Sequence, residues 1–553
     1  MKMKKTKTMS KVLATIAMAL TTVTGFAQTN LGAECGCPSP VSSRPTVLLS
    51  TLATNGGAGD GELIASNVIL DCSKTWILDK KIYVAPGKSL TIMPGTVIKG
   101  RSYPLAADAV ALTVEVGGKI FASGSETCQI VFTAEADNLD GTFPVTTVGS
   151  WGGICIAGKA SNNLTLAANG PFVVGTAGKI CVADGIGTFE GFNSTNSKDQ
   201  FGVTPASFDD NDNSGILKYV SIRHAGAVLV LGGELNALSL GSVGRGTTIE
   251  HIEIVSCADD GIELWGGTVN LKYCSFLFGN DDNLDWDCGW RGNAQFLFVL
   301  KNDAAGSVDS DNGFEADADD QKSNLLPRSH PVIYNATIIG NSKTVLTVDN
   351  SAIAGINAKE LTEGEIYNSV IANFIRGFNM TKALGTRTGT SEAYHNWSAA
   401  NGNGSQSLKV KCNTFVGTTD AITLDRSTAG LVAADNTQFT TTDLNTVVAS
   451  LPGFSFALVR TGNTFSTRPD AIPNPALSTA GCPVAPVDGF FTPAPYRGAF
   501  ASTGDSWLSP WSYSVVLNAV SGIQACPNDV NNDGTINVQD FNAVLGSFGT
   551  NCQ

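Results

Sequence analysis

Short runs of alternating apolar and polar residues recur through the middle of the chain. Leu217–Ile222, Ile249–Ile254 and Leu271–Phe276 share one pattern, in which apolar residues at both ends enclose polar ones. Further members of the set are Ile333–Ile338, Ile366–Ile371 and Leu408–Phe415. This alternation is typical of β-strands that turn one face toward a core. No segment has the apolar spacing of a long amphipathic helix, so the pattern predicts an all-β protein.

The chain also matches itself at an offset of 22 residues. Ala258–Gly267 matches Asn280–Gly289, and a shorter copy follows at Asp311–Glu315. Leu90–Ile98 similarly matches Leu112–Ile120 in the N-terminal half. Short β-rich runs separated by Gly, Asn and Asp corners are typical of a solenoid that adds one rung per repeat. We therefore expect a right-handed parallel β-helix with loops inserted at its corners.

The patterns divide the chain into five parts. These are a signal peptide at 1–27, an N-terminal lead-in segment at 28–59, the β-helix at 60–484, a terminal rung with an aromatic cap at 485–522, and a small calcium-binding module at 523–553. The aromatic cap is expected to cover the open end of the solenoid, because unpaired strand edges need protection. The alternative for this aromatic segment is a carbohydrate-binding platform.

The N-terminal segment has the composition of a secretory leader. Five lysines precede the apolar run Val12–Leu20, and a small-residue site follows at Gly25–Ala27. No later apolar run approaches the roughly 18–20 residues that a membrane span needs. We therefore expect an exported protein, extracellular or at the outer cell surface, with no transmembrane segment in the mature chain.

The net charge and the cysteine content indicate which classes of partner and which cellular compartment to expect. Loss of the five leader lysines changes the net charge from −14 to −19. An acidic protein of this kind is a poor binder of nucleic acid, which leaves cations, polysaccharides or another surface protein as expected partners. The chain has 13 cysteines, and an exported protein permits disulfides. We expect Cys35 and Cys37 to enter two different disulfides rather than to bind a metal.

Five motifs carry a resemblance to a known family. They are Leu90–Gly100, Gly149–Gly153, Leu217–Gly226, Asp259–Gly267 and Tyr496–Phe500. Together they resemble a family of secreted proteins of Bacteroidetes and related bacteria, over roughly residues 60–522. The resemblance implies a right-handed parallel β-helix and export. It implies no reaction and no catalytic residues, because the function of that family is unassigned.

The C-terminal module contains the spacing of a calcium-binding loop. Its expected oxygen ligands are Asp529, Asn531, Asp533, the backbone carbonyl of Thr535, Asn537 and Asp540. Cys526 and Cys552 bracket the loop and are expected to form a disulfide. An Asp at the last ligand position resembles a dockerin repeat, although a dockerin has two repeats and this chain has one. The alternative is a loop that is merely acidic.

A second group of acids falls on the repeats. The candidate cation ligands are Asp259, Asp260, Glu263, Asp281, Asp282, Asp285, Asp311 and Glu315. Rungs lie about 4.8 Å apart, so these carboxylates should repel one another unless cations or hydrogen-bond donors intervene. Asp and Asn also serve as corner residues that accept backbone hydrogen bonds. The sequence thus leaves a structural role and a cation site, with Ca²⁺ as the expected ion, both open.

A catalytic role for the same acids is a third interpretation. Asp259–Glu263 resembles the paired-Asp strand of β-helix polygalacturonases, but the Gly-His-Gly motif of that family is absent from the sequence. Arg291 would be the base or stabilising group of a calcium-assisted lyase. We therefore expect a non-catalytic scaffold for adhesion or glycan contact, with a polysaccharide lyase or glycoside hydrolase as the alternative.

Overall fold

The computed structural model describes most of residues 28–520. The gaps are 55–61, 65, 104–108, 172, 174–179, 193–195, 231–232, 302–311, 319–324, 342–352, 382–391, 401, 403, 426–430, 502–505 and 518. The expected signal peptide, the C-terminal calcium loop with Asp529–Asp540, the Cys526 and Cys552 pair, and Asp311 all lie outside the described residues.

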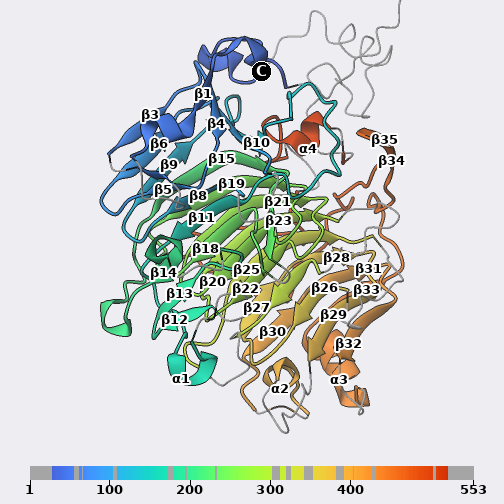
Figure 1. Ribbon diagram of the computed structural model, residues 1–553. Helices are drawn as coiled ribbons and strands as arrows, with labels where there is room; N and C mark the ends of the chain where they lie inside the picture. Colours follow the sequence, from blue (N-terminus) through green and yellow to red (C-terminus); the bar gives the residue numbers. More distant parts are fainter. Residues whose placement is uncertain are drawn as a thin grey trace, which may run out of the picture.

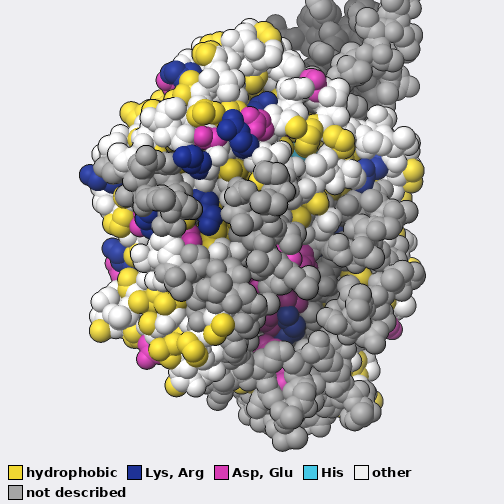
Figure 2. Space-filling view, in the orientation of Figure 1, with side chains coloured by type: hydrophobic (Ala, Val, Ile, Leu, Met, Phe, Trp, Pro, Cys, Tyr) yellow, Lys and Arg dark blue, Asp and Glu magenta, His cyan; other side chains and the backbone are white. Residues whose placement is uncertain are grey.

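Two large parallel sheets form the body of the molecule (Figure 1). A representative turn of the chain runs through β20 (Ile262–Trp265), β21 (Asn270–Leu277) and β22 (Leu284–Asp287). β20 pairs in parallel with β22, while β21 belongs to the other sheet. Each turn thus returns the chain to the same sheet one rung further on, and the predicted all-β parallel β-helix is confirmed. Figure 2 shows acidic side chains gathered in a hollow in the middle of one face.

Most strands of both sheets are short, and the longest ones belong to the 17-stranded sheet. The 11-stranded sheet also holds β2 (Glu62–Ile64), β5 (Ile82–Val84), β8 (Ala111–Val114), β11 (Gly153–Ala157), β18 (Leu238–Gly241), β24 (Phe314–Ala316), β26 (Ala354–Ala358), β29 (Arg376–Thr381) and β32 (Asp420–Asp425). The 17-stranded sheet also holds β1 (Thr46–Leu48), β3 (Val68–Leu70), β4 (Thr75–Leu78), β6 (Ser89–Ile92), β7 (Val97–Gly100), β9 (Lys119–Ser123), β10 (Ile130–Ala134), β15 (Gly215–Arg223), β19 (Thr248–Val255), β23 (Asn293–Leu300), β25 (Val332–Ile339), β27 (Gly364–Tyr367), β28 (Val370–Ala372), β30 (Leu408–Lys411), β31 (Thr414–Val416) and β33 (Thr446–Val448).

Smaller elements decorate this body in the part of the chain that the structure describes. The short antiparallel sheets are β12 (Cys181–Ala183) with β13 (Ile186–Thr188) and β14 (Gln200–Gly202), β16 (Val228–Val230) with β17 (Gly233–Glu234), and β34 (Val459–Thr461) with β35 (Thr464–Thr467). The α-helices are α1 (Leu166–Asn169), α2 (Ala393–Trp397), α3 (Ala433–Thr437) and α4 (Tyr513–Val516).

The predicted alignment of the central strands is confirmed, with one strand missed. Leu217 pairs with Ile249, and Ile249 pairs with Leu271. β23 lies between β21 and β25 but was not predicted, because its apolar run is almost continuous and hides the alternation. In the longer run Leu408–Phe415, Val410 pairs with Ile366 and Phe415 pairs with Ile371.

The N-terminal 22-residue alignment is wrong. Leu90 lies in the 17-stranded sheet and pairs with Ile120, whereas Leu112 lies in the 11-stranded sheet and pairs with Ile82 and Ile154. Each segment is a short β-rich strand followed by a glycine corner. Because strands on different faces of a solenoid share this composition, local similarity alone did not identify the face.

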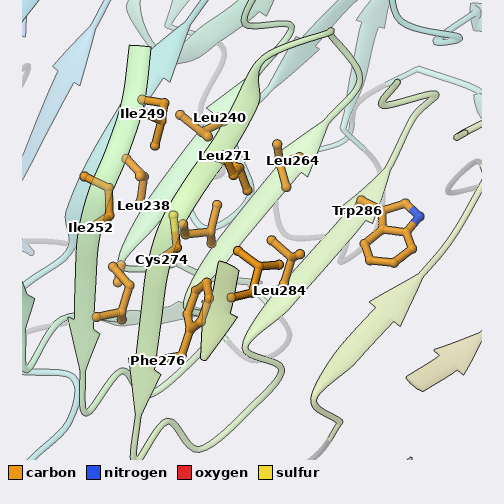
Figure 3. Close-up of a cluster of buried hydrophobic side chains, with 14 of the residues drawn as sticks. Leu238, Leu240, Ile249, Ile252, Leu264, Leu271, Cys274, Phe276, Leu284 and Trp286 are labelled. Carbon is orange, nitrogen blue, oxygen red and sulfur yellow. The ribbon is translucent and has the colours of Figure 1, made fainter. Parts of the chain in front are cut away.

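The inward side chains of successive rungs form the core (Figure 3). Leu240 pairs with Leu264, which pairs with Trp286, and all three are buried. Phe276 on β21 belongs to the same core cluster and is also fully buried. Burial of apolar surface is the main stabilising contribution to such a core, and stacking like positions of neighbouring rungs makes it continuous.

The long strands of the 17-stranded sheet bend at one residue per rung. Tyr219, His251, Tyr273 and Phe296 occupy successive rungs at this bend, with φ values of 51, 54, 58 and 60°. Residues other than glycine rarely adopt this left-handed conformation. Here each bend places a ring over the ring of the next rung, with centroids 4.3, 4.5 and 5.0 Å apart. Favourable ring packing accompanies the strained bends.

The C-terminal segment, here called the strap (residues 483–501 and 506–517), lies along the side of the solenoid. Gln295 exchanges two 2.8 Å hydrogen bonds with the backbone of Thr492. The buried carboxylate of Glu253 accepts hydrogen bonds from the backbone N–H groups of Tyr513 and Ser514 at the start of α4. We expected residues 485–522 to cover the end of the solenoid, but their described part packs across the rungs instead. Trp507 and Trp511 of the strap pack against Tyr273 and Tyr219 at the strand bends.

Among the described residues, three disulfides join parts of the chain that are distant in sequence. Cys35 pairs with Cys128 and Cys37 with Cys72, so the expected participation of Cys35 and Cys37 in two disulfides is confirmed. The third disulfide joins Cys412 at a strand bend to Cys482 just before the strap. Cys155, Cys257 and Cys274 are buried free thiols.

Loss of the Cys412–Cys482 disulfide should destabilise the protein. The bond closes a loop with a sequence separation of 70 residues. Replacing Cys482 with serine should lower the free energy of unfolding by about 2–4 kcal/mol, because the unfolded chain gains conformational freedom. Urea denaturation measures this change. Cys412→Ser should cost the same and the double variant no more, whereas additive losses would contradict a shared bond as the cause.

Candidate functional site

A column of outward-facing carboxylates crosses the 11-stranded sheet. Glu263 on β20 pairs in register with Asp285 on β22, which pairs with Glu315 on β24. Their strand neighbours Leu264 and Trp286 belong to the core, so the alternation of a strand directs the acids outward. The predicted alignment of these three acids is confirmed.

Asp260 and Asp282 occupy the corner before the column and have a structural role. One oxygen of Asp260 accepts the backbone N–H of Asp282 at 3.0 Å, and one oxygen of Asp282 accepts the backbone N–H of Asn312. Asn236 and Asn312 continue this ladder on the flanking rungs. The corner interpretation therefore accounts for one oxygen of each aspartate. The second oxygen of each carboxylate is not needed for the ladder.

The acids come close enough to share cations. Three overlapping groups have ligand oxygens within 4.8 Å of one another. They are Asp259 with Asp260 and Asp281, Asp260 with Glu263 and Asp285, and Asp282 with Asp285 and Glu315. The structure thus brings together every predicted ligand of this face except Asp311, which it does not describe.

Hydrogen-bond donors contact the carboxylates at both ends of the column, and a lysine ammonium group adds a positive charge at one end. Asn236 donates to Glu263 at 2.5 Å at one end. Asn357 donates to Glu315 at 3.1 Å, and Lys359 lies 2.5 Å from Glu315 at the other end. Among the described residues, the buried Oδ1 of Asp285 has no hydrogen-bond partner. A buried acceptor without a donor is costly, so Asp285 marks the point where a cation would gain most.

Burial and mutual repulsion oppose ionisation of these carboxyl groups. Burial raises the pKa of Asp260 well above its ordinary value, and Asp285 and its other acidic neighbours raise it further. The pKa values of Glu263 and Asp285 are raised for the same two reasons. Burial raises the pKa of Asp317, at the end of β24, to about 8 although Lys359 opposes the shift. Without a cation, these groups are therefore harder to ionise than ordinary carboxyl groups.

Two cationic groups differ in their relation to the column. Lys359 lies 3.1 Å from Asp317, and although burial lowers its pKa, Asp317 and Glu315 outweigh burial and hold the pKa well above its ordinary value. It is therefore a fixed positive charge and a poor base. Arg291, the residue expected to serve a lyase, instead donates to Ser161 and lies 3.4 Å from Asp210. The contacts of Arg291 do not favour the lyase alternative.

Sequence reasoning missed four residues of this site: Asn236, Asp317, Asn357 and Lys359. Asp317 was visible two positions after Glu315. Asn357 and Lys359 lie on and just after β26, whose run Ala-Gly-Ile-Asn-Ala has too few large apolar residues to stand out as a rung. A register search for strands between Glu315 and Arg376 could have found both.

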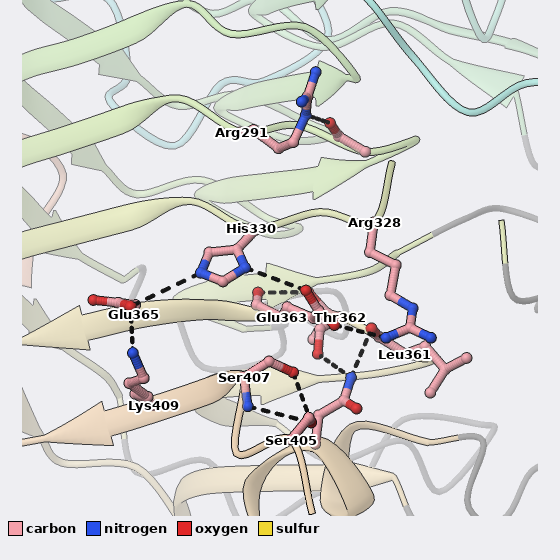
Figure 4. Close-up of polar contacts among 12 residues, drawn as sticks. Arg291, Arg328, His330, Leu361, Thr362, Glu363, Glu365, Ser405, Ser407 and Lys409 are labelled. Carbon is pink, nitrogen blue, oxygen red and sulfur yellow. Dashed lines mark hydrogen bonds and ion pairs between the residues drawn. The ribbon is translucent and has the colours of Figure 1, made fainter. Parts of the chain in front are cut away.

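A separate ion-pair network lies where β25, β27 and β30 of the 17-stranded sheet begin (Figure 4). Nδ1 of His330 lies 3.2 Å from Glu363, and Nε2 lies 3.9 Å from Glu365. The hydrogen bond to Glu363 and the nearby negative charge of Glu365 raise the pKa of His330 to about 9. Arg328 and Lys409 each lie 2.6 Å from one of the glutamates. The network fixes the loop before β25 against β27 and β30, and its role is structural.

This network should make stability depend on pH. Because its pKa is raised, protonated His330 stabilises the fold fully below its ordinary value of 6.5, and the contribution disappears as pH rises through about 9. His330→Gln should therefore lower the melting temperature at pH 6 by about 2 °C and have little effect at pH 10. In the control Arg328→Gln the loss should persist at pH 10, because arginine stays charged. Equal losses for His330→Gln at both pH values would contradict the account.

The described residues include no helix of the length and apolarity that a membrane crossing requires. Residues 61–450 match the family model described as "Pectate-lyase like beta helix domain". No curated protein and no solved structure gives a significant match. The matched region holds the complete carboxylate column and takes in well over half of the chain. The protein therefore belongs to the pectate-lyase-like β-helix domain family.

Proposed function

We propose that this protein is an exported, non-catalytic β-helix scaffold that contacts polysaccharide through cations held on its acidic face. The observation that carries the proposal is the position of Asp285 between Glu263 and Glu315, with a buried oxygen that no donor among the described residues reaches. Hard oxygen ligands at this density suit Ca²⁺, which takes six to eight oxygens and tolerates irregular geometry. Bound Ca²⁺ would also present open positions to carboxylates of an anionic glycan.

The family match and the disulfides support the remaining parts of the proposal. A pectate-lyase-like domain fits a protein that acts on carbohydrate. Three disulfides fit an oxidising compartment outside the cytoplasm. The acidic loop Asp529–Asp540 would add a calcium-stabilised attachment module after the solenoid.

Retention on immobilised polygalacturonate and alginate tests the scaffold proposal. The full chain should be retained in Ca²⁺ and released by EGTA, and Asp285→Asn should not be retained. Asp420→Asn, on the same sheet but away from the column, should behave as wild type. Calcium-dependent release of reducing ends or unsaturated uronates from either polymer would contradict the non-catalytic part and support the lyase or hydrolase alternative. Retention that ignores EGTA would contradict the role of the cation.

A further inference from the structure

A large cleft lies between the bends of the long strands and the strap. Its volume is about 800 Å³, within the size range of small-molecule sites. One wall consists of the four stacked rings of the bends, from Tyr219 to Phe296. The strap forms the other wall, chiefly with Tyr496, Phe500 and Trp507. The cleft and the acidic face belong to different sheets.

The aromatic walls are held rigidly. Each ring of the bend stack packs on the next at 4.3–5.0 Å, so their edges rather than their faces line the cleft. On the strap, Trp507 stacks on Phe500 with centroids 5.5 Å apart and donates its indole N–H to the carbonyl of Ala499 at 2.9 Å. Trp507 and Tyr496 are only partly buried and keep surface for a ligand. A preformed aromatic site of this kind loses little entropy on binding.

Hydrogen-bond acceptors accompany the aromatic groups. Glu126 and Glu250 line the cleft, and the Tyr219 hydroxyl donates to Glu126 at 3.2 Å. Lys218 pairs with Glu250 at 3.1 Å and offsets part of its charge. The carboxylates repel anionic ligands, and a lipid would offer no hydrogen-bond donors to their remaining acceptor positions. A ligand that has both apolar faces and hydroxyl groups can pack on the aromatic rings and also donate hydrogen bonds to the carboxylates.

The cleft also continues beyond its main body. A second pocket of about 280 Å³ shares Glu126 and Pro510 with it and extends along residues 28–34 of the N-terminal segment. Two adjoining pockets with common lining residues suit a chain of several units better than a single compact ligand.

We propose that this cleft binds a neutral oligosaccharide and that the binding does not require calcium. The inference is independent of the proposed function of the acidic face, which holds anionic glycan through a cation. Sugar C–H faces would pack on the partly exposed rings of Trp507 and Tyr496, while hydroxyl groups would donate to Glu126 and Glu250.

Titration calorimetry of the full chain in EGTA tests the proposal, with cellohexaose, xylohexaose and N-acetylchitohexaose as probes. At least one of them should bind saturably with a Kd below about 1 mM. Trp507→Ala should weaken this binding by about tenfold or more, and Glu126→Gln by several-fold. Phe490→Ala changes an aromatic residue of the same strap outside the cleft and should bind as wild type.

Two results would overturn the proposal. One is the absence of saturable binding of all three probes at concentrations up to about 10 mM. The other is unchanged binding in both Glu126→Gln and Glu250→Gln, two conservative variants of the cleft carboxylates that keep the test valid if Trp507→Ala does not fold. Binding that needs Ca²⁺ and disappears in Asp285→Asn would assign the glycan to the acidic face and equally exclude the cleft.

Discussion

Replacing Asp260 with asparagine should stabilise the cation-free protein and weaken its binding of Ca²⁺ by about ten- to a hundredfold. The asparagine oxygen still accepts the backbone N–H of Asp282, while the repulsion from Asp285 and the other acids is removed. Alanine at the same position should instead destabilise the protein by about 1–3 kcal/mol, because a buried N–H loses its acceptor. Thermal unfolding in EGTA and calcium titration measure the two effects.

The opposite signs of these two substitutions separate the roles of Asp260. Asp420→Asn removes one negative charge from the same sheet and should change neither stability nor calcium binding appreciably. If Asp260→Asn destabilises the protein as much as alanine does, the carboxylate is a structural group that the fold needs in its charged form. That result would contradict a cation site whose carboxylates repel one another when no cation is bound.

Replacing Phe276 with alanine should cost about 3–5 kcal/mol of stability. The ring is fully buried in the core between the two sheets, and the surrounding rungs cannot close the cavity without shifting whole strands. Urea denaturation followed by far-ultraviolet circular dichroism measures the loss. Because neighbouring rungs unfold together, the midpoint should move for the whole solenoid rather than for one part of it.

The matched control for Phe276 is Ile69→Ala. Ile69 is an apolar strand residue that is 65% exposed, so its truncation should change stability by less than about 0.5 kcal/mol. A loss at Phe276 no larger than the loss at Ile69 would show that the core is loosely packed there. It would contradict the continuous core described for the rungs.

The sequence predicted the central rungs because their corners have equal lengths. Ala258–Gly267 and Asn280–Gly289 fall on the same sheet, where Ile262 pairs with Leu284 at the predicted offset. The alignment of Leu90 with Leu112 was wrong because strands in the two sheets have similar compositions, so the sequence does not tell which sheet a strand belongs to. The position of the strap was not predictable, since contacts such as that between Glu253 and Tyr513 join residues 260 positions apart.

The candidate site was predictable in its register and not in its electrostatics. The alignment of Glu263, Asp285 and Glu315 follows from the repeat alone. Two electrostatic features depend on contacts between rungs. Asp260 accepts a hydrogen bond from the backbone N–H of Asp282, and Lys359 forms an ion pair at only one end of the column. The aromatic segment 485–522 was offered as an alternative carbohydrate-binding platform, but its partner wall on the strand bends was missed because the two walls, such as Phe296 and Tyr496, are distant in sequence.

Calorimetric titration of Ca²⁺ into the full chain tests the central claim most directly. Asp529→Ala and Asp533→Ala should first be introduced, so that the predicted C-terminal loop cannot contribute to binding. The account predicts saturable binding at pH 7 that weakens as the pH falls, because the raised pKa values of Asp260, Glu263 and Asp285 make protons stronger competitors of the cation. It also predicts loss of this binding in Asp285→Asn. Absence of calcium binding in this background, or binding that Asp285→Asn leaves unchanged, would contradict the account.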